Sequence, residues 1–103
     1  MDIFARIKRL VVARRVVFTA KADDEMVADE LTPELVYESI LNAPGLNKVL
    51  RSRDPHTHRA EKLYVIKGLT FDGVDVYTKG KILKTETGDV FYVLISSKRS
   101  TDL

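Results

Sequence analysis

The sequence predicts an α+β domain in which N-terminal helices pack on one face of a three- to four-stranded antiparallel sheet. Apolar residues recur at spacings of three and four in the first 45 residues, which is the period of an amphipathic helix. Over most of the remaining chain they alternate with polar residues, which is the period of a strand. Short turn segments separate these stretches, and short connections join antiparallel neighbours. At 103 residues, we expect one domain covering 1–103.

Three segments of the first half carry helix signals. Residues 3–11 place their apolar side chains on one side, with Arg and Lys between them, and predict about three helical turns. A second helix is expected over 23–28, where acids at the start suit the helix dipole. A third begins at Thr32, a hydroxyl cap followed by Pro33, and ends within 42–45. Between the first two, residues 16–19 predict a connector or a small strand.

The second half predicts strands separated by turns. Residues 46–50 are expected to form one strand, and a polar loop is expected to follow over 51–60. Three longer strands are expected over 61–67, 75–82 and 91–99. Asp72-Gly73 and Gly88-Asp89 supply the turn residues between them.

Composition excludes several classes of protein. With 45% hydrophobic and 31% charged residues, the chain is expected to be globular and not disordered. No apolar run approaches the roughly 18 residues that span a bilayer, and the N-terminus lacks the apolar stretch of a secretory signal. The absence of cysteine excludes disulfides and thiolate metal sites. We therefore expect a cytoplasmic protein with no membrane partner.

The net charge of +2 conceals a segregation of charge along the chain. Residues 22–45 contain seven acids and no Lys or Arg, whereas the segments on either side are basic. The acids can simply form a solvated helix face. The basic remainder indicates a polyanionic partner.

One predicted strand carries ionisable side chains on a single face. Alternation places Asp75, Tyr77, Lys79 and Lys81 together, a surface suited to phosphate. RNA cleavage without a metal needs a base for the 2′-hydroxyl, cations for the phosphorane and an acid for the leaving 5′-oxygen. Glu61 is a candidate base, or a residue that positions one, and Tyr77 is a candidate acid. A strand lysine can also merely protect an edge, and a strand tyrosine can be half-buried packing.

Two other pairs of residues complete the set of candidates. Lys98 and Arg99 end the last predicted strand and add cations for RNA binding, together with Lys79 and Lys81. His56 and His58 are the only histidines, and two ligands without a third give a weak metal site. Surface histidines, or histidines that contact an RNA phosphate, are the alternatives. We expect no metal and no cofactor.

Six short segments carry a resemblance to one known family: Ile7-Lys8-Arg9-Leu10-Val11, Val17-Phe18-Thr19, Ile40-Leu41-Asn42, Leu46-Asn47-Lys48-Val49-Leu50, Val76-Tyr77-Thr78-Lys79 and Tyr92-Val93-Leu94-Ile95-Ser96-Ser97-Lys98. The first four segments resemble the N-terminal half of MqsR toxins, and the last two resemble the C-terminal strands of that family. These toxins are ribonucleases of bacterial type II toxin–antitoxin systems with the RelE-like microbial RNase fold.

The resemblance implies a function and a catalytic set. The family's catalytic residues fall on Lys48, Tyr77 and Lys98, while Glu61 lies near the position of a family glutamine. Leu50 stands where the family has a sulfur-bearing side chain. The implied activity is metal-independent cleavage of mRNA that leaves a 2′,3′-cyclic phosphate and a 5′-hydroxyl. The implied partners are mRNA and a neutralising antitoxin, often one with a zinc-binding domain and a helix-turn-helix.

Two other functions are compatible with the sequence. The chain could be a non-catalytic module of the same fold that binds RNA, the ribosome or a protein. It could also be a housekeeping domain with a charged surface, which would be favoured if the acidic helix covered the basic sheet face. Catalysis by this set is expected only if Lys48, Tyr77 and Lys98 converge within a few ångströms in one concave site. If they lie on opposite faces of the sheet, RNA binding is still compatible with the sequence but catalysis is not.

Overall fold

In the computed structural model, which describes residues 2–101, each helix begins at a side chain that caps it. Helix α1 (Ile3–Val12) is capped by Asp2, helix α2 (Ala20–Ala28) by Thr19 and helix α3 (Pro33–Asn42) by Thr32. Each cap accepts a hydrogen bond from the backbone N–H three residues later, at 2.8, 3.2 and 3.3 Å respectively. Helix α2 therefore begins three residues before the predicted start, because Thr19 and not a later acid caps it.

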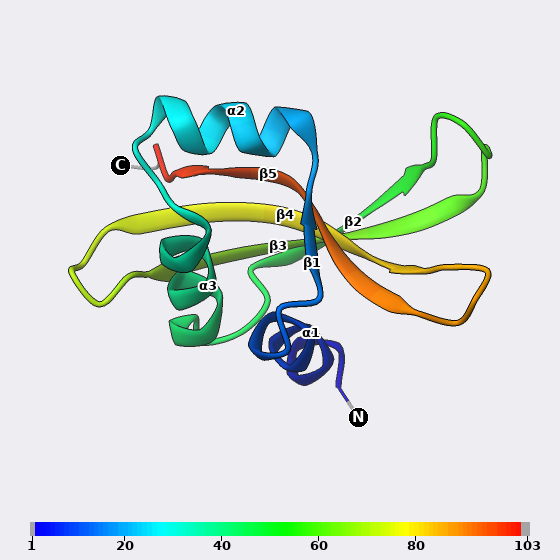
Figure 1. Ribbon diagram of the computed structural model, residues 1–103, viewed down its shortest axis with the longest axis horizontal. Coiled ribbons are helices and arrows are strands. Elements are labelled where there is room, and N and C mark those ends of the chain that lie inside the picture. The colour runs from blue at the N-terminus through cyan, green and yellow to red at the C-terminus, as the bar shows by residue number, and fades with distance from the viewer. Residues whose placement is uncertain (1, 102–103) are drawn as a thin grey trace.

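Five strands form one mixed sheet in the order β1-β5-β4-β3-β2 (Figure 1). The prediction of a three- to four-stranded antiparallel sheet is therefore confirmed only in part: β2 to β5 pair antiparallel, but a fifth strand makes the sheet mixed. The additional strand is β1, which has only three residues and runs parallel to β5. A small strand was one of the two alternatives predicted for residues 16–19, but its pairing with the other end of the chain leaves no local signal in the sequence. The strands are β1 (Val16–Phe18), β2 (Lys48–Arg53), β3 (Ala60–Leu69), β4 (Asp75–Lys84) and β5 (Val90–Arg99).

The predicted polar loop over 51–60 is shorter than expected. Strand β2 continues to Arg53, and β3 begins at Ala60, so the connection is a hairpin turn. The N–H of Asp54 donates to the carbonyl of Arg59 at 2.9 Å, and the N–H of His58 donates to the carbonyl of Asp54 at 2.9 Å. These bonds close the turn, so polar residues that were predicted to lie in the loop extend the β2–β3 ladder instead. The polar composition of the segment did not predict this extension.

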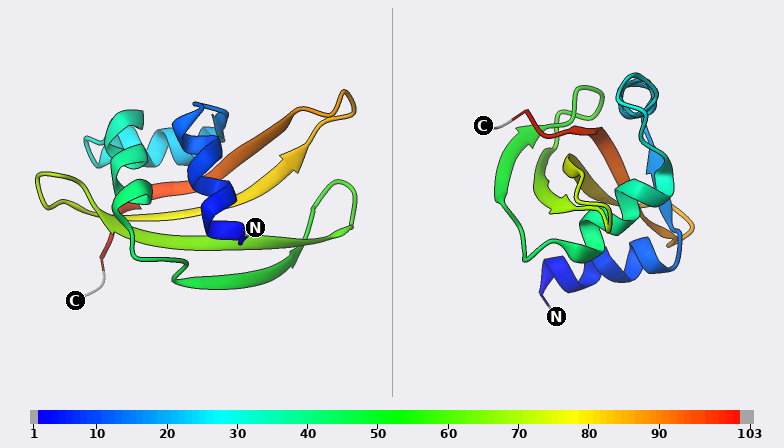
Figure 2. Two further views of the ribbon diagram at one scale, coloured as in Figure 1. Left: turned by 90° about the horizontal axis from the view of Figure 1, so that it is seen from below. Right: turned by 90° about the vertical axis from the view of Figure 1, so that its left-hand side faces the viewer.

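All three helices lie on one side of the sheet (Figure 2). The main core lies between the helices and the sheet. Its fully buried members are Ile7, Val11, Val36, Ile40, Val76, Tyr92 and Leu94. Gly68 lets α3 approach β3 closely, because a Cβ at this position would overlap the backbone carbonyl of Ser39. No helix within residues 2–101 is long and apolar enough to cross a membrane.

Helix α2 runs beside the edge of β5 beyond the end of β1 (Figure 1). The Glu25 carboxylate accepts hydrogen bonds from the hydroxyl of Ser96 at 2.8 Å and from the N–H of Ser97 at 3.1 Å. Asp29 accepts from the N–H of Arg99 at 2.8 Å. Part of the acidic segment thus accepts hydrogen bonds from backbone N–H groups at the edge of the sheet, which would otherwise be unpaired. The helix does not cover the opposite, basic face.

Candidate nucleic-acid interface

The sheet face opposite the helices, which we call the open face, brings together most of the predicted site residues. Strand register pairs Lys67 with Tyr77 and Tyr77 with Lys98, so these three side chains form one row across β3, β4 and β5. A second row consists of Lys48, Val65 and Lys79 on β2, β3 and β4. Residues paired directly across a ladder point to the same face. The open face therefore holds a phenol and several ammonium groups.

Tyr77 and Lys98 are in contact. The Lys98 ammonium nitrogen lies 5.6 Å from the centre of the Tyr77 ring, within the range of a cation–π interaction. Both side chains are half-buried. Lys79 is two residues along the same strand and shares the face, at a spacing of about 7 Å. This group places one proton donor beside two cations.

Lys48 shares the open face but does not contact Tyr77. It is exposed on the edge strand β2 and is separated from Lys79 by Val65 of β3. Two strand spacings amount to about 10 Å between the backbones of Lys48 and Lys79. Lys48 therefore does not converge with Tyr77 and Lys98 in one site, as was expected of a shared catalytic set, and extends the cationic surface away from their contact.

The open face has an apolar floor beneath its charges. Val65 is fully buried, and Leu63 and Val93 are each 8% exposed, although no described helix lies on this side. Val65 is paired with Lys48 and Lys79, and Val93 is paired with Lys81. Lysine stems can lie along such apolar surface while the ammonium groups reach solvent. The result is a basic surface over a hydrophobic base.

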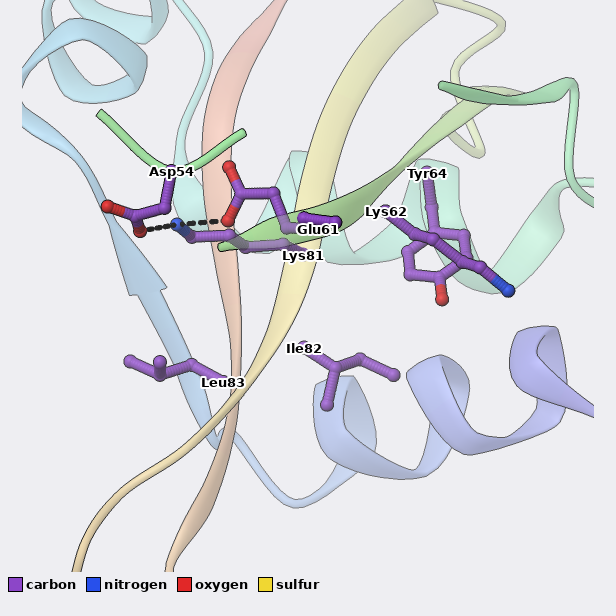
Figure 3. Close-up of a pocket in the computed structure, with 8 residues that line it drawn as sticks. Asp54, Glu61, Lys62, Tyr64, Lys81, Ile82 and Leu83 are labelled. Atoms are coloured by element: carbon purple, nitrogen blue, oxygen red, sulfur yellow. Dashed lines mark hydrogen bonds and ion pairs between the residues drawn. The ribbon is translucent and has the colours of Figure 1, made fainter. Parts of the chain in front are cut away.

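Glu61 lies at the other end of the sheet from Tyr77. It is six residues from Lys67, the partner of Tyr77, which corresponds to about 20 Å along β3. Its Oε2 accepts a hydrogen bond from the Lys81 ammonium at 2.9 Å, and Lys81 also reaches Asp54 Oδ2 at 3.3 Å (Figure 3). Glu61 therefore belongs to an ion-pair cluster with Lys81 and Asp54, and cannot reach a phosphate held at Tyr77.

Hydrogen bonds set the protonation of this cluster. The backbone N–H groups of His56 and Thr57, at 2.7 and 3.1 Å, are the main reason that the pKa of Asp54 falls to about 2. The hydrogen bond to Glu61 is the main cause that raises the pKa of Lys81 above its usual value, with a further contribution from Asp54. Lys81 is thus a fixed cation that joins two carboxylates.

A cleft opens where β3 and β4 separate. Their ladder stops at Tyr64 and Gly80, whereas the β2–β3 and β4–β5 ladders continue to the hairpin ends. The two hairpins then diverge (Figure 1). The cleft has a volume of about 310 Å³. Its lining consists of Asp54, Ala60, Glu61, Lys62, Tyr64, Lys81, Ile82 and Leu83.

Three predicted RNA contacts lie away from the open face. His56 and His58 are exposed in the β2–β3 turn, where His58 has a left-handed φ of 58°. Arg99 pairs with Val76 and therefore points to the helix side, where its Nε donates to the carbonyl of Asp29 at 3.1 Å. Within residues 2–101, no three His, Asp or Glu side chains are grouped closely enough to hold a metal.

Asp75 is a candidate that the sequence placed on this face without giving it a role. It is the first residue of β4, is exposed, and pairs with Leu69 on the open side. Alternation puts its carboxylate on the same face as the Tyr77 ring, about 7 Å along the strand. The spacing of two residues was visible in the sequence, but the distance that separates Glu61 from Tyr77 required the strand register.

Comparisons with known proteins do not identify a relative: no protein-family model, curated protein or solved structure matches the chain. The open face and the cleft are therefore the features from which a function can be inferred.

Proposed function

We propose that this chain is a metal-independent endoribonuclease of the MqsR-like toxin type. In this proposal it binds single-stranded mRNA on the open face and cleaves it to a 2′,3′-cyclic phosphate and a 5′-hydroxyl. The observation that carries the proposal is the contact between Lys98 and Tyr77 on a face that also presents Lys48 and Lys79.

The charge of the open face supports the proposed RNA binding. Phosphate contacts from lysine dominate the affinity of proteins for nucleic acids. The two register rows space cations along and across the strands, so a flexible single strand can place successive phosphates on them. Glu25 of α2 and Asp29 at its C-terminal end are bonded to the β5 edge and do not neutralise this surface. This arrangement disfavours the reading of a housekeeping domain whose acidic helix covers its basic face.

The proposed reaction is an internal transesterification at the phosphate held beside Tyr77. The 2′-oxygen forms a bond to phosphorus while its proton passes to the Asp75 carboxylate. The bond from phosphorus to the 5′-oxygen breaks, and the Tyr77 phenol gives its proton to that oxygen. Lys98 and Lys79 stabilise the charge that develops on the phosphorane. Asp75 takes the role first expected of Glu61, because Glu61 is about 20 Å away along β3.

The proposal includes a partner and a compartment. As a toxin of this type, the chain would act on mRNA in the cytoplasm, free or on the ribosome, and would be neutralised by a cognate antitoxin. Expression in cells with and without the adjacent open reading frame tests this part. Growth arrest that the neighbour relieves is the expected result.

A non-catalytic RNA-binding module is the second candidate function. It is favoured by the position of Glu61, whose carboxylate is held by Lys81 at the far end of the sheet. In that case the open face would bind RNA, and the Tyr77–Lys98 contact would be a packing feature.

One experiment separates the two functions. The purified chain is incubated with end-labelled single-stranded RNA in excess EDTA, and the fragment ends are characterised. A Tyr77→Phe protein purified in the same way controls for contaminating nucleases. Cleavage by the native chain alone, with cyclic phosphate and 5′-hydroxyl ends, supports the ribonuclease. RNA binding without cleavage supports the binding module, and neither binding nor cleavage contradicts both.

A further inference from the structure

The cleft between the two hairpins is a second feature that a ribonuclease of this kind could use. It lies beside the open face, and the ion-pair cluster spans it from Asp54 and Glu61 on one hairpin to Lys81 on the other. Figure 3 shows both carboxylates directed towards the Lys81 ammonium. The bridge holds the hairpin arms at a fixed separation, so the cleft exists before any ligand enters.

The size and lining of the cleft suit a small planar group. Its volume of about 310 Å³ is at the lower end of the range for small-molecule sites. Ile82 and Leu83 supply apolar walls, and Leu83 is 45% exposed, so part of this wall is open to solvent. Lys62 and Lys81 balance the two carboxylates in charge. A neutral, partly apolar hollow does not attract a phosphate, but it can accept a nucleobase.

Glu61 provides the recognition group. Its side chain is 19% exposed, and only its Oε2 is bonded to Lys81. No residue within the described part of the chain donates a hydrogen bond to Glu61 Oε1. By contrast, Asp54 Oδ1 already accepts from two backbone N–H groups. Glu61 therefore keeps acceptor capacity for a ligand, and it has no proton to donate as a carboxylate.

We propose that the cleft binds one unstacked guanine of the RNA through the Glu61 carboxylate. Guanine is the base whose Watson–Crick edge presents two adjacent donors, N1–H and the N2 amino group, which match the two oxygens of a carboxylate. Uracil has acceptors on both sides of its single donor, and adenine and cytosine each present one amino group. Single-stranded RNA is read in this manner, by hydrogen bonds to exposed base edges. The inference rests on the proposed binding of RNA to the open face.

The position of the cleft relative to Tyr77 makes this a specificity site. Lys81 is four residues from Tyr77 on the same face of β4, a distance of about 13 Å along the strand. A guanine in the cleft would therefore lie a short run of nucleotides from the phosphate at Tyr77. Lys79 lies between the two positions and can contact the connecting phosphate.

The test measures binding without cleavage. Short uridine-rich oligonucleotides with 2′-O-methyl groups cannot undergo transesterification, and they carry guanine, inosine, adenine, cytosine or uracil at one central position. Fluorescence anisotropy gives the affinity of the full chain for each. We expect guanine to bind roughly tenfold more tightly than uracil, and inosine, which lacks the N2 amino group, to lose most of this advantage.

A matched pair of variants assigns the effect to Glu61. Glu61→Gln keeps the size and an acceptor for Lys81 but replaces one acceptor with a donor, so the guanine preference should disappear. Glu86→Gln makes the same charge change on an exposed residue at the tip of the neighbouring hairpin. This variant should retain the preference for guanine. Thermal unfolding shows whether the Glu61→Gln protein is folded. The comparison of guanine with inosine uses the native chain, so it does not depend on this variant.

The possible results are distinct. Equal affinity for all five bases would overturn the cleft inference while RNA binding by the open face stands. A guanine preference that survives in Glu61→Gln would also overturn it. Failure of every oligonucleotide to bind would overturn both this inference and the proposed function.

Discussion

Gly80 of β4 lies directly against the ring of Tyr92 of β5. A Cβ atom at Gly80 would be 2.6 Å from the Tyr92 Cζ and 2.7 Å from its hydroxyl oxygen. The ring is fully buried in the core, and the β4–β5 ladder changes register between Lys79 and Gly80. The absence of a side chain therefore lets a large aromatic ring pack under the strand that carries Tyr77 and Lys81.

Gly80→Ala should destabilise the protein by about 1–3 kcal/mol, because the added methyl group must displace a buried ring or the strand itself. Gly45→Ala is the control, since a Cβ there meets no atom within 4 Å. Chemical denaturation of both variants measures the free energy of unfolding. Equal stability of the two would show that the core adapts to the extra methyl group at no cost.

Glu25→Ala should also destabilise the protein, by about 1–3 kcal/mol. The change removes the acceptor of the Ser96 hydroxyl and the Ser97 N–H, and the Ser96 side chain is only 2% exposed. Asp24→Ala removes the same charge from the exposed side of α2 and should stay within about 0.5 kcal/mol of the native chain. Similar losses in both variants would indicate a general effect of helix charge and not a capped sheet edge.

The features that the sequence predicted are those with local causes. Thr32 followed by Pro33 marks the start of α3, and alternation in β4 identifies its polar face. The structural role of Glu25 was not predictable, because its partners are about 70 residues later in the chain. The solvated helix face that its segment suggested is therefore only part of the explanation.

The same distinction applies to the candidate site. Tyr77 and Lys98 were each identified from the sequence, but their contact depends on the β4–β5 register, which the irregularity after Lys79 shifts by one residue. Glu61 was a candidate base that lies near the position of a family glutamine, but the length of β3 separates it from Tyr77. Its ion pair with Lys81 depends on how two hairpins diverge, which no local pattern describes.

Tyr77→Phe should lower RNA cleavage by about a hundredfold, the usual effect of losing a general acid. The ring and its contact with Lys98 remain, so the fold and RNA affinity should change little. Single-turnover cleavage and anisotropy on the same RNA separate the two effects. Unchanged cleavage would remove the phenol from the mechanism. A parallel fall in affinity would mean that Tyr77 binds RNA instead.

Lys79→Met should lower the affinity for RNA and should make that affinity less dependent on the salt concentration. Each lost phosphate contact to single-stranded RNA lowers the slope of log affinity against log salt by about 0.7. Met retains the apolar stem over Val65, so the free energy of unfolding should be nearly unchanged. Lys21→Met, on the exposed side of α2, is the matched control and should leave the slope as it is. If both variants gave the same slope of log affinity against log salt, the RNA would not contact Lys79 on the open face.

Acid should loosen the β2–β3 turn below about pH 4. The folded pKa of Asp54 is about 2, below its unfolded value near 3.9, so its carboxylate stabilises the turn above pH 4. This contribution is lost as the pH falls from about 4 to about 2. Lys81 has a raised pKa, and its contribution is present at every pH below its unfolded value near 10.4.

The backbone N–H signals of His56 and Thr57 report this transition directly, because both groups donate to Asp54. Their NMR chemical shifts should titrate with a midpoint near pH 2, and the transition should be absent in Asp54→Asn. The turn amide of Gly88, in the other hairpin, donates to Thr85 and serves as an internal reference. A midpoint near pH 4 at His56 would mean that these hydrogen bonds do not hold the carboxylate ionised, and the bridge across the cleft would then be weaker than its geometry indicates.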